Sequence, residues 1–209
     1  MLKRIRVIWG DLWDVAGPLR GPVSCLLVML VSSVTASATV VPRLSFDELT
    51  RGAEKIVHAR CVAKDTYLES MSGTIWTRHV FEIVESLKGG WERQIVVSEP
   101  GGVYGSRGQW VPGAPHFEPG DEAILFLART ITGKWRVHGW GQGNFRVQQD
   151  PIAGASLVQA DMSGIELAEL SATPGQAPRI LPRVLPARET MSRLKQRIRE
   201  QLLKQAPLR

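Results

Sequence analysis

Apolar and polar residues alternate through much of the chain between residues 54 and 148. In a strand, successive side chains point to opposite faces, so this period of two predicts strands that are buried on one side. The first such segment follows Glu54. Its apolar face holds Val57, Ala59, Cys61 and Ala63, and its polar face holds His58, Arg60 and Lys64. We therefore expect a strand here with Cys61 pointing into the core.

Five further segments have the β-branched and aromatic content of strands and are separated by turn residues. They are residues 75–87, 94–98, 123–128, 135–138 and 144–148. Segment 123–128 is apolar at consecutive positions, so we expect a central strand covered on both faces. Residues 101–120 show no periodicity, and long irregular segments of this kind are often functional. The pattern predicts a mainly β fold, an antiparallel barrel or sandwich.

Two helices frame this β region. Ser45 and Glu48 have the spacing of a capping box and predict a short helix. Near the C-terminus, residues 189–204 carry apolar side chains at helical spacing among arginines and lysines, which predicts a basic amphipathic helix. Those apolar positions are Met191, Leu194, Ile198 and Leu202. Such a helix either packs on the barrel or contacts weakly an anionic membrane or an acidic partner.

The pattern divides the chain into four parts. Residues 1–38 resemble a signal peptide, with basic residues followed by an apolar run over 22–31 and small residues at Ala36 and Ala38. We expect cleavage after Ala38 and export to the periplasm or beyond; an uncleaved inner-membrane anchor is the alternative. Residues 39–150 are the predicted barrel. Residues 151–188 are a predicted linker because prolines recur there, and residues 189–209 contain the basic helix.

Composition and charge narrow the function classes. The chain has 209 residues, of which 44% are hydrophobic and 22% charged, which fits one globular core and excludes a disordered chain or a polytopic membrane protein. The net charge of +6 is concentrated toward the two ends, so we expect no nucleic-acid partner. Two cysteines, Cys25 and Cys61, cannot form a disulfide framework.

The sequence contains no recognisable catalytic or metal-binding motif. The four histidines, at positions 58, 79, 116 and 138, lack metal-ligand spacing, and no Gly-x-Ser-x-Gly elbow is present. We expect His58 and His138 on solvated strand faces. The glycine-rich residues 101–108 lack the lysine of a phosphate loop. We therefore expect no metal, no cofactor and no enzymatic activity, although a hydrolase with an unrecognised site stays open.

Aromatic residues supply the candidate contacts. Five tryptophans, at positions 76, 91, 110, 135 and 140, either line a ligand groove or pack at the core and rim. Trp110 lies in the irregular segment with other side chains typical of binding hot spots. We predict partner contact by Tyr104, Arg107, Trp110 and Phe117.

Residues 45–147 resemble an uncharacterised family of exported bacterial proteins. The matching motifs are Leu-x-x-x-x-Leu at 44–49, a strand at 56–62, Ser-Leu-Lys-Gly at 86–89, Glu-Pro-Gly-Gly at 99–102, Pro-Gly-Asp-Glu at 119–122, Leu-Phe-Leu at 125–127 and Gly-Gln-Gly-Asn-Phe at 141–145. The same order is similar to tissue inhibitors of metalloproteinases and netrin-like modules. That resemblance implies an OB-like barrel. Those inhibitors chelate zinc with an N-terminal cysteine. The expected mature chain begins at Thr39 and has no cysteine at that position.

From these observations we expect an exported, non-enzymatic binding module whose partner is a protein or a glycan. The binding surface would be the 101–117 loop and the barrel rim. The alternative is an inhibitor or accessory protein of a secreted protease. In that case the extended residues 39–43 would lie in or near the cleft of the protease.

Overall fold

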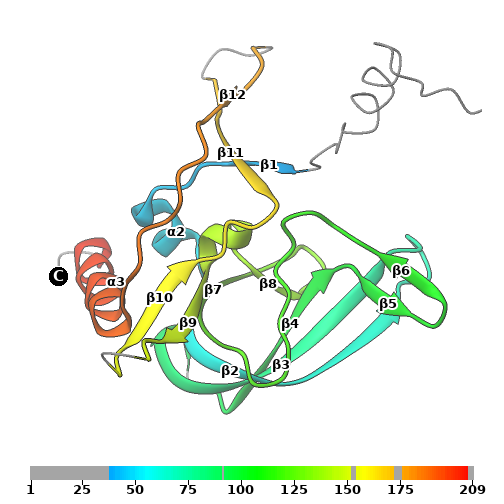
Figure 1. The fold of residues 1–209 in the computed structure, drawn as a ribbon, viewed down its shortest axis with the longest axis horizontal. Helices are drawn as coiled ribbons and strands as arrows, with labels where there is room; N and C mark the ends of the chain where they lie inside the picture. The colour runs from blue at the N-terminus through cyan, green and yellow to red at the C-terminus, as the bar shows by residue number, and fades with distance from the viewer. Residues whose placement is uncertain (1–37, 91, 152–153, 172–175, 207–209) are drawn as a thin grey trace, which may run out of the picture. The chain divides into compact units, whose positions relative to one another are not determined.

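The computed structural model describes residues 38–90, 92–151, 154–171 and 176–206 (Figure 1). Over these residues the protein is mainly β, as predicted, and contains a closed five-stranded barrel with two helices. The predicted leader, apart from Ala38, and Trp91 lie outside the described residues. No described helix is long and apolar enough to cross a membrane.

Five strands close the barrel in the spatial order β2, β3, β4, β8, β7 and back to β2. Their bounds are β2 Lys55–Leu68, β3 Ile75–Lys88, β4 Gln94–Pro100, β7 Glu122–Arg129 and β8 Trp135–Val137. β4 and β8 run parallel, and the other neighbouring pairs are antiparallel. A three-strand meander closed by a parallel third and fifth strand is the OB-like arrangement.

Further strands extend from the barrel. After the 3₁₀ turn η1 (Trp140–Gly143), β9 (Asn144–Gln149) pairs with the first half of β7, β10 (Ser156–Ala160) with β9, and β13 (Glu189–Thr190) with β10. A separate small sheet joins β1 (Thr39–Pro42), β11 (Ile165–Glu169) and β12 (Arg179–Ile180).

These strands correct the predicted linker over residues 151–188. That segment contributes β10, β11 and β12 to the two sheets. Each is at most five residues long, and β11 pairs in parallel with β1 from the other end of the chain, Thr39 opposite Ile165. Strands this short leave little periodic pattern, and only β11 has a partner at the other end of the chain, so the prolines dominated the prediction.

The barrel interior holds one core cluster, which includes Phe81, Val97, Leu125 and Cys61. Cys61 is buried, as predicted, and burial raises the pKa of its thiol. Ala63 was predicted on the same face but is exposed. A register shift between Cys61 and Ala63 accounts for the difference, because a bulge inserts one residue and re-aims the side chains after it.

A second core cluster lies outside the barrel, under α2 (Phe46–Gly52) and α3 (Met191–Gln205). The predicted capping box at Ser45 and Glu48 is present. Leu194 and Ile198 of α3 are fully buried in a cluster with Phe126 of β7. The basic helix therefore packs on the barrel, and the consecutive apolar residues of β7 are covered on both faces, as predicted.

The docked helix also explains why His58 is buried, where the sequence predicted a solvated side chain. Its Nε2 lies 2.6 Å from Glu122 Oε1, and Lys195 Nζ of α3 lies 3.1 Å from its Nδ1. The lysine ammonium is a donor only, so Nδ1 accepts and Nε2 donates to Glu122. His138, also predicted to be solvated, is half-buried, and burial lowers the pKa of its imidazole.

A buried carboxylate joins the short β8 to β4. Glu99 accepts hydrogen bonds from Arg136 Nε at 3.1 Å, Arg136 Nη2 at 2.9 Å and the Val137 amide at 2.7 Å. Only one residue pair, Val97 with Trp135, is in register between these strands. The side chain of Glu99 therefore takes over part of the barrel closure that backbone pairing would otherwise provide.

Candidate functional site

The predicted irregular segment contains a small hairpin of β5 (Gly102–Tyr104) and β6 (Arg107–Gln109). Tyr104, Arg107 and Trp110 are exposed on it or just after it, as the contact prediction requires. Phe117 is only 1% exposed, so its predicted role in partner contact is wrong. The chain returns into the barrel at that point, and the Phe117 ring packs edge-on against Phe81, with centroids 5.0 Å apart.

The hairpin turns through Gly105 and Ser106. Gly105 has a φ of 59°, the positive value that a type II′ turn requires at its first central position and that glycine adopts at low cost. Tyr104 and Arg107 face each other across this turn. The local sequence therefore encodes the tip, but an isolated two-stranded hairpin is marginally stable in water.

Contacts with the barrel hold the base of the hairpin. Thr66 Oγ1 of β2 donates to the Val103 carbonyl at 2.6 Å, and Thr77 Oγ1 of β3 donates to the Gly101 carbonyl at 2.7 Å. At Gly102, which has a φ of 126°, an added Cβ would lie 2.4 Å from Thr77 Oγ1. This close approach requires glycine, and it presents the tip in a defined orientation.

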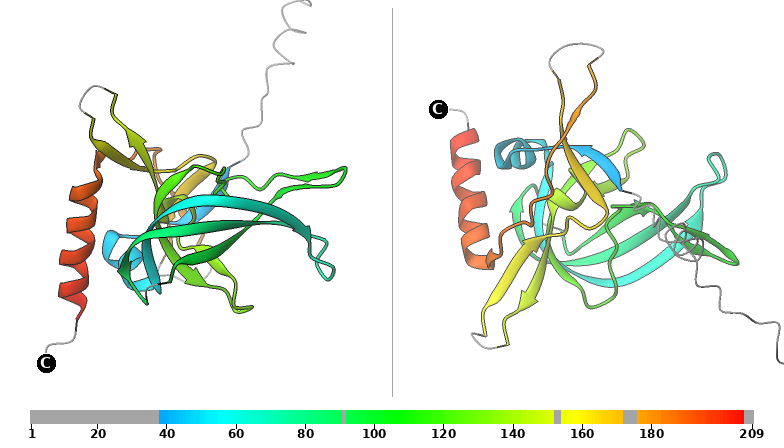
Figure 2. Two further views of the ribbon diagram at one scale, coloured as in Figure 1. Left: turned by 90° about the horizontal axis from the view of Figure 1, so that it is seen from below. Right: turned by 45° about the horizontal axis from the view of Figure 1, so that its top comes forward.

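The hairpin and the residue after it expose large apolar side chains to solvent. Val103 is 66% exposed, Tyr104 46% and Trp110 73%. With Arg107 they form what we call the hairpin surface. It lies on the side of the barrel opposite α3, next to the turn between β2 and β3 (Figure 2).

The side chain of His116 packs against one face of the Trp110 indole. The two rings stack with centroids 4.9 Å apart and an angle of 28° between their planes. The pKa of His116 is lowered mainly by burial and also by the positive charge of the nearby Arg146. The imidazole that stacks on the indole is therefore neutral at pH 7. A neutral stacked ring fixes the orientation of Trp110 while leaving one indole face open.

A hollow of about 370 Å³ lies at the foot of the hairpin. Its walls come from β2, β3, the hairpin base and the loop before β7, and include Lys64, Thr66, Thr77, His79, His116 and Glu118. Burial lowers the pKa of His79 to about 4, so this histidine is neutral at pH 7. Both threonine hydroxyls donate to hairpin carbonyls, which makes them structural groups rather than free nucleophiles.

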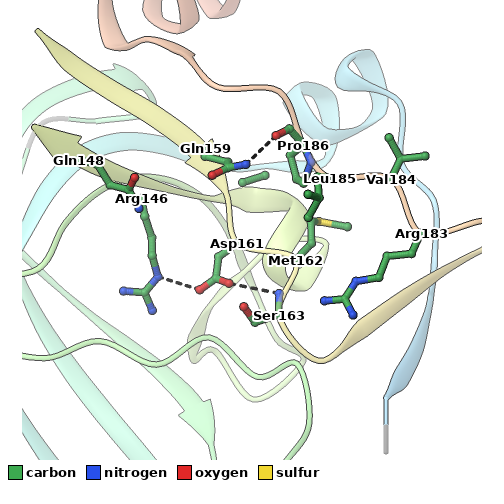
Figure 3. A pocket seen from close by; sticks show the side chains of 11 residues that line it. Arg146, Gln148, Gln159, Asp161, Met162, Ser163, Arg183, Val184, Leu185 and Pro186 are labelled. Carbon is green, nitrogen blue, oxygen red and sulfur yellow. Dashed lines mark hydrogen bonds and ion pairs between the residues drawn. The ribbon is translucent and has the colours of Figure 1, made fainter. Parts of the chain in front are cut away.

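A second hollow, of about 390 Å³, contains an arginine that the sequence analysis did not identify (Figure 3). Arg146 of β9 donates to Asp161 at 2.7 Å, to Asp121 at 3.0 Å and to the His116 carbonyl. Through His116 it fixes the segment that supports Trp110. Its partners lie 15 to 30 residues away from it in the sequence, so no local motif marks it.

The other described tryptophans pack against cations at the rim. Lys134 Nζ lies 4.2 Å from the Trp76 ring centroid, and the guanidinium groups of Arg129 and Arg136 lie 4.5 Å and 5.2 Å from Trp135 and Trp140. All three indoles are half-buried. The packing interpretation therefore fits them, and Trp110 differs from them in its exposure.

No group of three or more histidine, cysteine or acidic residues in the described part of the chain is arranged to hold a metal ion. Comparison with protein-family models, curated proteins and solved structures found no match for this chain.

Proposed function

We propose that this protein is an exported, non-enzymatic binding module that contacts a protein or a glycan through the hairpin surface. The observation that carries the proposal is the exposure of Val103, Tyr104 and Trp110 on a hairpin whose base is fixed to the barrel. Exposed aromatic and arginine side chains on a rigid support resemble binding hot spots, because little conformational entropy is lost when they are covered.

The export part of the proposal rests on the sequence of residues 1–38, with its basic start, apolar run and Ala-x-Ala ending. The resemblance to an uncharacterised family of exported bacterial proteins supports the same location. In this proposal the hairpin surface meets its partner in the cell envelope or outside the cell.

The protease-inhibitor alternative, as the sequence suggested it, requires residues 39–43 to enter a protease cleft. These residues form β1, and the amides of Thr39 and Arg43 donate to the carbonyls of Gly164 and Ala168 at 3.0 and 2.9 Å. Val41 is buried. Because β1 would have to leave its sheet, the geometry favours the hairpin surface over this segment.

Affinity capture with matched variants tests the proposal. The tagged chain would be incubated with envelope and culture-medium fractions, and captured proteins and glycans identified by mass spectrometry. We expect the variant Tyr104→Ala, Arg107→Ala, Trp110→Ala to lose the species that the unmodified chain retains. The control variant Met71→Ala, Ile131→Ala removes two fully exposed apolar side chains from the turns after β2 and β7 and should keep them. Equal capture by all three proteins would contradict the proposal.

A further inference from the structure

Residues 181–186, Leu-Pro-Arg-Val-Leu-Pro, connect β12 to the segment that leads into β13 and α3; we call them the strap. The strap runs along the outside of β10 and has no regular secondary structure (Figure 1). A residue before proline is biased away from helix toward extended conformation, and the strap contains two such residues, Leu181 and Leu185. Pro182 and Pro186 in turn have a fixed φ. The sequence therefore favours an extended backbone.

The strap is held at its ends and free between them. The Leu181 amide donates to the Leu167 carbonyl at 2.8 Å, and the Pro186 carbonyl accepts from Gln159 Nε2 at 2.7 Å. The backbone groups of Arg183, Val184 and Leu185 make no hydrogen bond with any described residue. Three consecutive residues thus present unpaired backbone donors and acceptors.

The side chains of this central part are also uncovered. Val184 and Leu185 are each 78% exposed, and Arg183 is exposed with no ion pair to any described residue. Two hollows, of about 390 and 360 Å³, share Met162, Arg183 and Val184 in their walls, and Figure 3 shows the first of them. The middle of the strap is therefore only partly packed against β10, β11 and the residues between them.

We infer that the strap is the binding and cleavage site for an endopeptidase that cuts after arginine. Such enzymes bind an extended peptide by adding it as a strand to their own backbone, and an acidic pocket receives the arginine. The strap offers the free backbone and Arg183 offers the cation. Water is the co-reactant: the bond between the Arg183 carbonyl carbon and the Val184 nitrogen breaks, Arg183 gains a carboxylate and Val184 gains an amino group.

A second exposed arginine shows why exposure is not sufficient. Arg107 also has no ion pair with any described residue, but it lies beside a two-residue turn and is paired with Tyr104 across the hairpin. A paired residue at a tight turn cannot extend into a protease cleft without opening the hairpin. Arg188 follows the strap and is also exposed, but its Nε donates to Gln159 Oε1 at 3.2 Å, so its side chain is held on β10. Arg183 is therefore the preferred site.

The cut chain is expected to remain in one particle. Cleavage removes the covalent link between the barrel and α3, but Leu194 and Ile198 stay buried. Glu85 of β3 accepts from both Lys195 and Arg199 at 2.7 Å. These contacts retain the C-terminal fragment. The inference concerns a different surface from the proposed function and does not depend on it.

Limited digestion of the folded full chain with trypsin tests the inference, with the C-terminal fragment beginning at Val184 as the readout in mass spectrometry. We expect it to be the first fragment cut from the described region. We also expect Arg183→Gln to slow its appearance by roughly a hundredfold, since the acidic pocket is then left unpaired. Arg107→Gln and Arg188→Gln should leave the rate unchanged. A first cut at another position, or an unchanged rate for Arg183→Gln, would overturn the inference.

An experiment with catalytically inactive trypsin tests whether the enzyme binds the strap through Arg183, independently of cleavage. The inactive enzyme should co-elute in size-exclusion chromatography with the unmodified chain and with Arg107→Gln, and not with Arg183→Gln. The cleaved protein should elute as a single particle that contains both fragments. Equal co-elution of all variants would show that Arg183 is not recognised, and separation of the fragments would contradict the retention of α3.

Discussion

Apolar side chains are buried on one side of the barrel and exposed to solvent on the other. On the α3 side, Leu194 and Ile198 are completely buried against β2 and β7. On the hairpin side, Val103 and Trp110 are mostly exposed, although the hairpin that carries them is anchored. Burial of apolar surface stabilises the fold, and exposed apolar surface does not. The difference suggests that the helix side serves stability and that the hairpin surface is available for a partner.

Charges follow the same division. On the α3 side, Glu85 pairs with Lys195 and Arg199, and Glu122 pairs with Arg60 and accepts a hydrogen bond from His58. Arg107 on the hairpin has no ion pair within the described chain. These acidic residues beside α3 are therefore paired within the described chain, whereas Arg107 has no such ion pair.

We expect the largest loss of stability from Phe126→Asp, which places a carboxylate in the core cluster beneath α2 and α3. Phe126 is fully buried, and its ring packs near Phe46 at 6.1 Å and Phe145 at 5.6 Å between centroids. An unpaired buried carboxylate costs several kcal/mol, against a total stability of roughly 5 to 15 kcal/mol. We expect loss of the cooperative unfolding transition in circular dichroism. A sharp transition near that of the unmodified chain would show that Phe126 is not in the core.

A pair of truncations tests the comparison directly. Ile198→Ala should lower the free energy of unfolding by about 2 to 4 kcal/mol, because the cavity cannot close fully. Val103→Ala should change it by less than about 0.5 kcal/mol, since the side chain is exposed. Denaturant titration measures both values. If the two variants were equally destabilised, the contrast between the two sides would be lost.

Acid should destabilise the fold through His79. Its pKa falls from 6.5 to about 4 on folding because burial disfavours the charged form. The unfolded chain therefore binds a proton as the pH drops below 6.5, while the folded chain does not until about pH 4. Stability should fall by about 3 kcal/mol across that window, at 1.36 kcal/mol per pKa unit.

Two other histidines act in the same direction, since burial also lowers the pKa of His116 and His138. Denaturant titrations between pH 4 and 7 give the slope, and His79→Gln should flatten it. If the slope were the same in both proteins, His79 would already be charged in the folded state.

Trp110→Ala is expected to have the smallest effect on stability and a large one on binding. Removal of an exposed side chain should change the unfolding free energy by less than about 0.5 kcal/mol. Loss of an aromatic anchor typically weakens binding by about 2 kcal/mol or more. Thermal melts and binding isotherms with a captured partner give the two numbers. A large drop in melting temperature would assign Trp110 to the core.

Much of the fold was predictable because its signals are local. The capping box at Ser45, the apolar run of β7, the inward Cys61 and the helical spacing of Leu194 and Ile198 each lie within a few residues. The strands over residues 151–188 were missed because each has at most five residues, and β11 in addition pairs with β1, far away in sequence. His58 was assigned to solvent because the helix that covers it comes 137 residues later.

The candidate site was predictable in part for the same reason. Tyr104, Arg107 and Trp110 follow from the composition of one loop. Phe117, in the same loop, differs from them only in that the chain has re-entered the barrel there. Arg146, which donates to the His116 carbonyl, has partners in two segments, the loop before β7 and the residues after β10. Long-range contacts of that kind require the three-dimensional structure.

Hydrogen exchange with and without a captured partner tests the central claim most directly. In the free protein, the amides at the tip of the hairpin should exchange rapidly and those of β7 slowly, since exposed hairpin ends open more readily than core strands. On partner addition we predict protection over residues 101–110, with β7 and α3 unchanged. Protection confined to α3 or to the strap, with the hairpin unaffected, would contradict the assignment of binding to the hairpin surface.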